Sequence, residues 1–585
     1  MADQGSRYGH PTKSCDIVLK GGITSGVVYP LALAALAEKY RFSSIGGTSA
    51  GAIAAAAAAA AEYGRDSENG GFDRLAKIPD EVGPNLLALF QPTPVLKPLF
   101  DIFVAALDAK TTMARIVAIA GAAVLGYWLS ALLGLLPGLL IAALALATGG
   151  SKGLLAFGVL LALTGLVAAI LLRLWKAANS DLAGNDFGLC PGLRQPYSSK
   201  EGFCDWLARL INEAAGLNED RPLTFGDLAA PPGGRPAIQL AMMTTSLMEE
   251  RPYSLPLPAE DRRFVFERSE WARIFPAGVM AFLVGRCDRF TPPAGEAGEY
   301  YYFPDSTRLP LIVAARMSLS FPFLISGVPL WRRDFTLQEE AEKNRLRRCF
   351  FSDGGLSSNF PIHFFDRLLP NLPTFAITLD EYDAKRNRDQ VWLPPNARSG
   401  IPLPVLPFSG TAAFVMRLVT SAKDWQDNLQ STLPGYRERI AHVALESGQG
   451  GLNLTMDDAT VRKIADFGKL AGSKLRDDFD LDGHRWRRFL VAMARMEETL
   501  DEVAKAYDGV PGGPEAFRDF LGRYSGHPDS YPQDPARLAE MLKRGAELAA
   551  SGASWRANPT IRDGRIPRPP TDLRITPKFS ASAVD

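Results

Sequence analysis

The feature that most constrains the fold is a long segment almost without charge. Residues 116–172 contain a single charged side chain, Lys152. The second half of the segment, "LLAFGVLLALTGLVAAILL", provides about 19–20 apolar residues, enough for one helix to cross a bilayer. The first half is longer than one span needs, and we expect it to be interrupted at Pro137-Gly138. Because residues 149–153 form a glycine-rich connection, the segment is predicted to be a hydrophobic helical hairpin.

Basic residues flank the hairpin on both outer sides, with Lys110 and Arg115 before it and Arg173 and Lys176 after it. Positive charge is enriched on the cytoplasmic side of membrane segments, so both outer ends are predicted to be cytoplasmic. The protein is therefore expected at the membrane. The alternative is a pair of buried core helices, although so long an uncharged run is unusual in a soluble core.

The remaining composition excludes little else. The 585 residues favour two or more structural units. The 64 basic and 64 acidic residues cancel, so no global charge indicates nucleic acid, and no nucleic-acid partner is expected. The five cysteines are scattered without metal-ligand spacing, which favours reduced thiols and no metal site.

Strands and helices alternate near the N-terminus. Residues 16–19 are predicted to form a buried strand, residues 27–40 a helix, and a second strand is predicted to end at Ser49. Eight consecutive alanines, 54–61, then predict a slim helix, since alanine has the highest helix propensity. This order predicts an α/β fold with a mostly parallel sheet. Further strands are expected at 236–247 and 374–382, and charged helices after about residue 455.

The second strand ends in the motif Gly-x-Ser-x-Gly. A serine on a sharp strand-to-helix turn needs small neighbours, and Gly47 and Gly51 supply them around Ser49. The helix N-terminus there favours developing negative charge. The motif therefore suggests a nucleophilic serine, and the alternative is a glycine turn with a serine N-cap.

A second glycine-rich turn, "KGGITSG" at residues 20–26, also lies between a predicted strand and a helix. Backbone N–H groups at such a turn point outward and can stabilise an oxyanion. Phosphate binding is the alternative, but the glycine spacing fits neither of the common nucleotide-binding motifs.

A serine nucleophile also needs a base. None of the histidines (10, 363, 442, 484 and 527) lies in an evident strand-end loop beside an acid. Asp353, in contrast, ends an apolar run and precedes Gly354-Gly355, which leaves room for a substrate. A carboxylate in a dry environment can act as the general base without a histidine.

Four blocks in this order resemble the patatin-like phospholipases, which use a Ser-Asp dyad in an α/β fold. They are the turn at 21–26, "GTSAG" around Ser49, "AARMSLSFPFLIS" at 314–326, and "DGGLSSNFP" at 353–361. The segment "RPLTFGDL" at 221–228 is also similar to the family. The resemblance covers roughly residues 14–385, with the hairpin as an insertion.

The resemblance implies a three-layer α/β/α core in which Ser49 is the nucleophile and Asp353 the general base. It also implies that the N–H groups of Gly21, Gly22 and Ile23 form the oxyanion hole, without metal or cofactor. The turn departs from the family at Ile23, where a third glycine is usual, and at Ser25, where a basic residue is usual. Isoleucine would be strained if its position required positive φ. Five further glycines are expected to support these motifs: Gly26, Gly47, Gly51, Gly354 and Gly355.

These interpretations predict a membrane-associated lipid acyl hydrolase of the phospholipase A type. It would cleave acyl esters of membrane phospholipids through an acyl-enzyme, with its catalytic domain on the cytoplasmic side. One alternative is a catalytically degenerate, membrane-anchored scaffold or interaction protein on the same fold, and another is a soluble esterase or thioesterase. Arg316 and Asn359 are expected to be local scaffolding, and no protein partner is indicated.

The predicted organisation has five parts. They are the first half of the catalytic core, the hairpin insertion, the second half of the core, a helical C-terminal region and an extended tail, at residues 14–109, 110–178, 179–445, 446–560 and 561–585.

Overall fold

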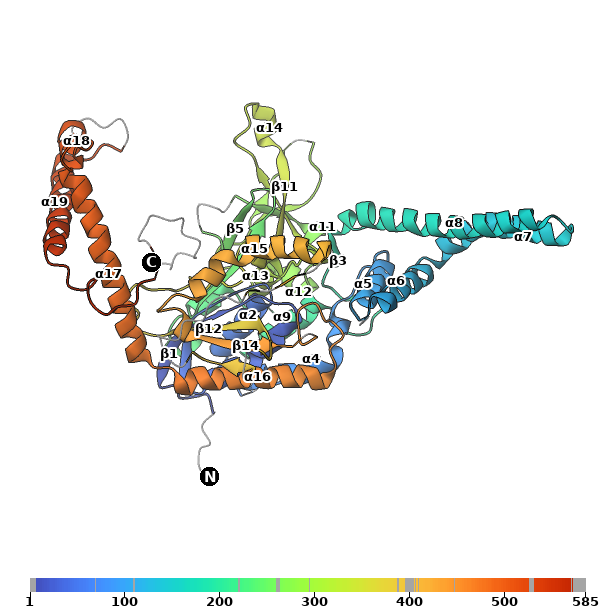
Figure 1. The fold of residues 1–585 in the computed structure, drawn as a ribbon, viewed down its shortest axis with the longest axis horizontal. Coiled ribbons are helices and arrows are strands. Elements are labelled where there is room, and N and C mark those ends of the chain that lie inside the picture. The colour runs from blue at the N-terminus through green and yellow to red at the C-terminus, as the bar shows by residue number, and fades with distance from the viewer. Residues whose placement is uncertain are drawn as a thin grey trace, which may run out of the picture.

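The computed structural model describes residues 7–571, except for residues 69, 109–110, 219–220, 259–262, 294, 387–388, 395–404, 406, 409, 447, 526–530 and 570. Lys110, one of the basic residues beside the predicted hairpin, and residues 572–585 of the predicted tail lie outside the described residues. A central core carries two projections, a hairpin on one side and a helical arm on the other (Figure 1).

Within the described residues, twelve strands form one mixed sheet. Its order is β13 (Val391–Trp392), β14 (Ile440–Leu445), β12 (Thr374–Glu381), β1 (Lys13–Leu19), β2 (Tyr40–Thr48), β4 (Gln239–Ser246), β11 (Leu346–Asp353), β10 (Val328–Arg333), β6 (Val265–Glu267), β8 (Tyr300–Tyr302) and β7 (Arg289–Phe290), while β5 (Arg251–Leu255) also pairs with β4. The remaining strands, β3 (Gly188–Cys190) and β9 (Phe323–Ile325), pair with each other.

The helices are α1 (Tyr29–Ala37), α2 (Ala50–Tyr63), α3 (Gly71–Ala76), α4 (Ile78–Val82), α5 (Lys97–Asp108), α6 (Thr112–Gly126), α7 (Trp128–Ala147), α8 (Lys152–Lys176), α9 (Phe203–Ala215), α10 (Phe225–Ala229), α11 (Arg268–Trp271), α12 (Ala277–Arg286), α13 (Leu311–Ser318), α14 (Glu340–Asn344), α15 (Thr411–Ser431), α16 (Asp458–Asp478), α17 (Leu481–Asp508), α18 (Phe517–Tyr524) and α19 (Pro535–Ala557). The predicted α/β class and the helical C-terminal region are confirmed.

The five central strands, β14, β12, β1, β2 and β4, pair in parallel. In the register, Leu19 lies opposite Gly47, and Thr48 lies opposite Met243. The carboxyl ends of these strands therefore meet at one edge of the sheet. β11 enters this edge antiparallel to β4 and ends at Asp353, opposite Thr244. The antiparallel strand thus brings a residue from far along the chain to the edge where β2 ends.

Both faces of the sheet are buried. On one face, α1, α2, α9 and α13 belong to the main hydrophobic core with alternate residues of β1, such as Ile17 and Leu19. On the other face, Val18 packs in a smaller cluster with Phe360 and Phe364. α15 lies next to this segment, because Asp427 of α15 accepts a hydrogen bond from the N–H of Phe360 (2.9 Å).

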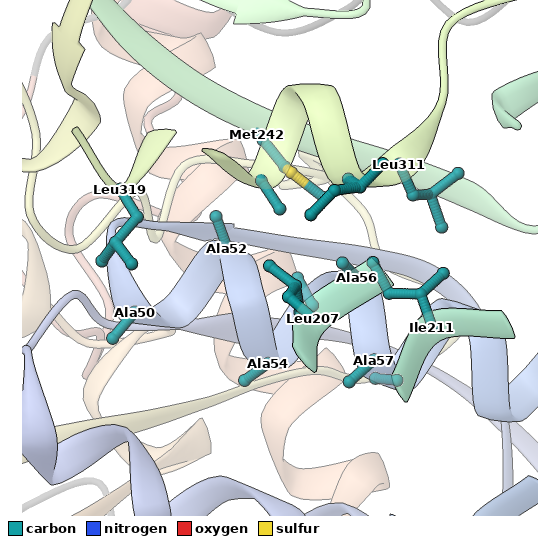
Figure 2. Close-up of a cluster of buried hydrophobic side chains, with 14 of the residues drawn as sticks. Ala50, Ala52, Ala54, Ala56, Ala57, Leu207, Ile211, Met242, Leu311 and Leu319 are labelled. Carbon is teal, nitrogen blue, oxygen red and sulfur yellow. The ribbon is translucent and has the colours of Figure 1, made fainter. Parts of the chain in front are cut away.

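The alanine block forms the predicted slim helix, α2, and its alanines are buried. In Figure 2, Ala52 and Ala56 point toward Met242 of β4 and Leu311 of α13, while Leu207 and Ile211 of α9 lie beside the helix. Methyl side chains let α2 lie close to its neighbours on several sides. This tight packing places the start of α2 directly behind the end of β2.

The hydrophobic segment forms three helices, and the interruption lies at a different place from the one predicted. α7 continues through Pro137, whereas the chain breaks at Tyr127, whose φ of −113° and ψ of 34° separate α6 from α7. The prediction of an interruption at Pro137-Gly138 was therefore wrong. The connection at residues 148–151 between α7 and α8 lies where the glycines predicted it.

Glycine and alanine form the contact between α7 and α8. A Cβ on Gly134 would lie 2.3 Å from the carbonyl oxygen of Gly165, and one on Gly138 would lie 2.1 Å from the amide nitrogen of Ala162. Most leucines of both helices are exposed, and Leu140 and Leu172 are 67% and 68% exposed. The hairpin is therefore not a pair of buried core helices.

The predicted C-terminal helical region is divided in its packing. α16 lies against α1, where a Cβ on Gly468 would meet the carbonyl oxygen of Val28 at 1.8 Å and one on Gly472 that of Ala32 at 2.2 Å. α17, α18 and α19 instead form the arm at the left of Figure 1, in which α17 and α19 run side by side. The first C-terminal helix thus covers the core, and the later helices extend from it.

Candidate active site

Ser49 occupies a strained turn between β2 and α2. Its φ of 56° and ψ of −129° lie outside the regions that non-glycine residues favour. Both glycines of the motif are required by close packing: a Cβ on Gly47 would lie 2.3 Å from the carbonyl oxygen of Gly51, and one on Gly51 would lie 2.3 Å from that of Leu19. This geometry matches the predicted nucleophile elbow, and only 3% of Ser49 is exposed.

Asp353 is fixed at the end of β11. Its N–H donates to the carbonyl oxygen of Ser320 (3.0 Å), and its Oδ1 accepts from the N–H of Gly355 (2.7 Å). The following glycine, Gly354, lies so close to β4 that a Cβ there would be 2.0 Å from the carbonyl oxygen of Met243. Within the described part of the chain, no donor is positioned for a well-aligned hydrogen bond to the buried Oδ2 of Asp353.

Ser49 and Asp353 lie next to each other although 304 positions separate them in the sequence. Burial raises the pKa of Asp353 from 3.8 to about 6, and hydrogen bonding by the Ser49 hydroxyl opposes this rise. The N–H of Gly355 and the charge of Lys423 on α15 lower the pKa further. The structure therefore brings the two predicted catalytic side chains together, with the carboxyl group in a dry environment.

The predicted oxyanion turn lies against the serine. A Cβ on Gly21 would be 3.1 Å from the Cβ of Ser49, and one on Gly26 would be 3.2 Å from that of Ala50. The N–H of Gly21 donates to the carbonyl oxygen of Asn359 (2.7 Å), so this predicted donor is already engaged. For Gly22 and Ile23, the described residues offer no acceptor to the backbone N–H groups.

The unusual Ile23 is accommodated without strain of the expected kind. Its φ is −88° and its ψ is −82°, so the position does not require a left-handed conformation. A backbone donor survives a change of side chain, which leaves the N–H of Ile23 able to serve an oxyanion. The departure from glycine at this position is therefore compatible with an intact turn.

Comparison with known proteins decides the family. The family model for the patatin-like phospholipases matches residues 17–112, which include both glycine turns and Ser49. A curated relative, the RpoH suppressor of Rhizobium meliloti (strain 1021), is 35% identical over 638 residues, covering 97% of this chain and 99% of the relative. This chain belongs to the patatin-like phospholipase family.

Patatin-like proteins are generally hydrolytic phospholipases or esterases that act on lipids, whereas the name of the relative states no reaction. Among solved structures, VipD from Legionella pneumophila matches with a TM-score of 0.30 at 12% identity, over 94% of this chain and 87% of that one. A similarity this low supports no conclusion about the site.

The patatin-like block at 314–326 contacts Ser49 and holds the backbone around the site in place. Ser318 accepts a hydrogen bond from the N–H of Ser49 on its Oγ (3.1 Å), a contact that the sequence analysis missed. Arg316 is fully buried and donates to Ser320 Oγ (2.8 Å) and to the carbonyl oxygen of Ser326 (2.8 Å). Arg316 thus holds the segment that follows α13, from Ser320 to Ser326, in agreement with its predicted scaffolding role.

The patatin-like block at 353–361 is held in a similar way. The carbonyl oxygen of Asn359 accepts from Gly21 N–H and from Thr48 Oγ1 (3.2 Å), which ties the predicted oxyanion turn to the end of β2. Ser358 donates to both carboxylate oxygens of Asp427 (3.0 Å each). Burial raises the pKa of Asp427 to about 6. No sequence motif marked Asp427, because it acts on the site from α15, far from the family blocks.

The structure also contains a histidine–acid pair that the sequence did not reveal. His442 Nδ1 lies 2.6 Å from Asp380 Oδ2, and Trp392 stacks on the imidazole with ring centroids 3.8 Å apart. These residues come from three strands, so no local motif brings them together. No contact joins this pair to Ser49 among the described residues, which leaves Asp353 as the group that lies beside the patatin-like serine.

Proposed function

We propose that this protein is a membrane-associated serine lipid acyl hydrolase of the phospholipase A type. Ser49 attacks the carbonyl carbon of an acyl ester while Asp353 accepts the proton of its hydroxyl group. The alcohol leaves with a proton returned from Asp353, and water then hydrolyses the acyl-enzyme by the same route. The observation that carries the proposal is a strained, buried Ser49 next to a carboxyl group with a raised pKa.

The raised pKa suits a base that works without histidine. A carboxylate with a pKa of about 6 remains mostly ionised at neutral pH, yet it binds a proton more strongly than an ordinary aspartate. The serine N–H is held by Ser318, so the hydroxyl is presented from a fixed backbone. A rigid elbow lowers the entropy cost of positioning the nucleophile.

The proposed oxyanion hole uses the N–H groups of Gly22 and Ile23. Both follow Gly21, whose packing against Ser49 brings the turn to the nucleophile. The engaged N–H of Gly21 then serves to hold the turn rather than to bind the substrate. Removing a single oxyanion donor typically costs about 10²–10³ in kcat, so two backbone donors are enough for substantial catalysis.

The hairpin supports a location at the membrane. α7 and the helix that begins at Lys152 are each long and apolar enough to cross a bilayer. Only 22% of the most apolar 18-residue stretch is buried in the first helix, and only 11% in the second. Small residues at the helix contact and leucines outside are typical of helices in lipid. A soluble esterase or thioesterase would require these leucines to be covered. With Arg115 and Arg173 beside its outer ends, we propose that the catalytic domain is cytoplasmic.

The proposed domain organisation follows from these roles. Residues 14–109 and 179–445 would form the two halves of the catalytic core, and residues 110–178 an inserted membrane hairpin. Residues 446–560 would add helices to the core and the arm, and residues 561–585 a tail.

The proposal is tested with purified protein on phospholipid vesicles. Wild type should release fatty acid, and Ser49→Ala and Asp353→Asn should each lose activity by at least about 10²-fold. A fluorophosphonate should label the wild type on Ser49 and leave Ser49→Ala unlabelled. Full activity in either variant would overturn the proposed dyad, and an inert, unlabelled wild type would favour a degenerate scaffold.

The membrane role has its own test. Deleting residues 116–172 should move the protein from the detergent phase to the aqueous phase and reduce hydrolysis of vesicle lipid. Hydrolysis of a short, water-soluble ester should persist in the deletion variant. Unchanged partitioning would contradict the membrane hairpin without affecting the proposed chemistry.

A further inference from the structure

An apolar cavity runs along one face of the alanine helix. The residues that α2 contributes to its lining are Ala50, Ile53, Ala54 and Ala57. Their spacing of three, four and seven positions places them on a single helix face. In Figure 2, Ala50, Ala54 and Ala57 point to one side of α2, opposite to Ala52 and Ala56. The part of the cavity wall that α2 forms is therefore a single helix face, on which three of the four side chains are alanine.

One end of the cavity is lined by residues that adjoin the proposed catalytic groups. Ala50 follows Ser49 directly, and Leu319 follows Ser318, the residue that holds the Ser49 N–H. Ile23 and Gly26 of the oxyanion turn also line this end. A carbonyl group held at the serine would thus have the cavity immediately beside it.

Aromatic side chains form another part of the cavity wall. Phe90, Phe203 and Trp206 line it, with ring centroids 6.4 Å apart for Phe90 and Phe203 and 6.2 Å apart for Phe203 and Trp206. The indole N–H of Trp206 donates to Glu81 Oε1 (3.0 Å), which fixes the ring. Along α2, Ala57 is about 10 Å from Ala50.

Apolar cavities in protein interiors remain dry and bind apolar ligands. A space enclosed by alanine, isoleucine and leucine side chains next to the nucleophile fits an alkyl chain and offers little to a charged or polar group. We infer that this cavity holds the acyl chain of the substrate, and that Ala54, Ala57 and the aromatic wall limit its length. The inference rests on the proposed acyl hydrolase function.

Filling the cavity should change the preferred chain length. With p-nitrophenyl esters from butyrate to palmitate, Ala54→Leu and Ala57→Leu should each lower the palmitate-to-butyrate ratio of kcat/KM by about tenfold or more. Ala56→Leu is the matched control, since Ala56 faces Met242 and Leu311 instead. It should leave the ratio unchanged. An unchanged ratio in both Ala54→Leu and Ala57→Leu would overturn the inference.

A shorter wall side chain provides a second variant that does not depend on filling space. Phe90→Ala should raise the palmitate-to-butyrate ratio, because it removes part of the aromatic wall and enlarges the cavity. Thermal unfolding separates the cavity from packed core: Ala54→Leu should keep the melting temperature of the wild type, whereas Ala56→Leu should lower it by overpacking. A ratio that falls in Phe90→Ala would also contradict the inference.

Binding distinguishes the failure of the cavity from the failure of the reaction. The Ser49→Ala variant should bind cis-parinaric acid, a fluorescent fatty acid, and the added Ala54→Leu substitution should weaken this binding about tenfold. Binding by a protein whose wild type hydrolyses nothing would keep the cavity and reject the proposed reaction. Hydrolysis of all chain lengths without any binding would reject the cavity and keep the reaction.

Discussion

The alanine helix α2 and the hairpin of α7 and α8 both lack charge over most of their length, but different side chains are buried in each. In α2 the alanines lie against the sheet and against α9 and α13, so the helix is enclosed. In the hairpin, glycine and alanine form the helix contact and the leucines remain outside. Apolar composition alone therefore does not determine where a helix lies. It also matters which face of the helix carries the smallest residues and which face carries the large apolar ones.

The difference has a physical basis. In water, leaving a leucine exposed forgoes about 25 cal/mol for each Å² of apolar surface that could be buried. A soluble hairpin would therefore turn its leucines inward. In lipid this advantage disappears, and helices associate through close backbone packing of small residues. The packing of the hairpin matches the second pattern, as the proposed membrane location requires. α2 has no leucine of its own and is enclosed by large side chains of its neighbours, such as Leu207 and Leu311.

The largest effect is expected where α2 meets the sheet. Gly51→Val would place side-chain atoms on the carbonyl oxygen of Leu19, only 2.3 Å from a Cβ at this position. We expect a loss of at least about 3 kcal/mol in the free energy of unfolding, or no folded protein at all. Denaturant unfolding followed by circular dichroism measures it.

A helical glycine in open space is the control. Nothing lies within 4 Å of a Cβ on Gly121 in α6, so Gly121→Ala should be tolerated and should favour the helix by about 0.5–1 kcal/mol. Equal effects of the two substitutions would mean that the packing of α2 against β1 is not what Gly51 serves.

A smaller effect is expected inside the hairpin. Gly138→Leu would separate α7 from α8, because a Cβ there lies 2.1 Å from the amide nitrogen of Ala162. We expect the hairpin to lose about 1–2 kcal/mol in detergent micelles. Faster proteolysis at residues 148–151, where the two helices connect, reports the loss. A hairpin that resists the protease as well as wild type does would show that the glycine contact is dispensable.

The smallest effect is expected on the outer surface of the hairpin. Leu163 is 55% exposed, so Leu163→Ala in micelles should change the free energy of unfolding by less than about 0.5 kcal/mol. A buried leucine typically costs about 2–5 kcal/mol when replaced by alanine. A change in that range would mean that another part of the protein covers this face.

Much of the core could be predicted because its signals are local. A side chain at position 47 or 51 would clash with the backbone, so both positions need glycine. This requirement is visible in the sequence as the motif Gly-x-Ser-x-Gly around Ser49. The alternation of apolar runs predicted the strands β1, β4 and β12. The break at Tyr127 could not be predicted in this way. The residue that signals an interruption in the sequence is Pro137, and α7 accommodates it inside a long helix.

Other parts of the site depend on long-range contacts. Asp427 supports the block around Ser358 from α15, and the N–H of Gly21, which follows β1, donates to the carbonyl oxygen of Asn359, which follows β11 far along the chain. Asp380 and His442 meet across β12 and β14 although 62 positions separate them. No motif encodes such pairs, so only the assembled sheet reveals them.

The most direct test of the account is the pH dependence of kcat/KM for hydrolysis of a neutral ester. Asp353 can accept a proton only as a carboxylate, and its pKa is raised to about 6. Activity should therefore fall about tenfold for each pH unit below 6 and reach a plateau above it. Asp353→Asn should remove this dependence together with at least about 10²-fold of the plateau activity. A profile in Asp353→Asn that keeps both the rate and the transition near pH 6 would contradict the account.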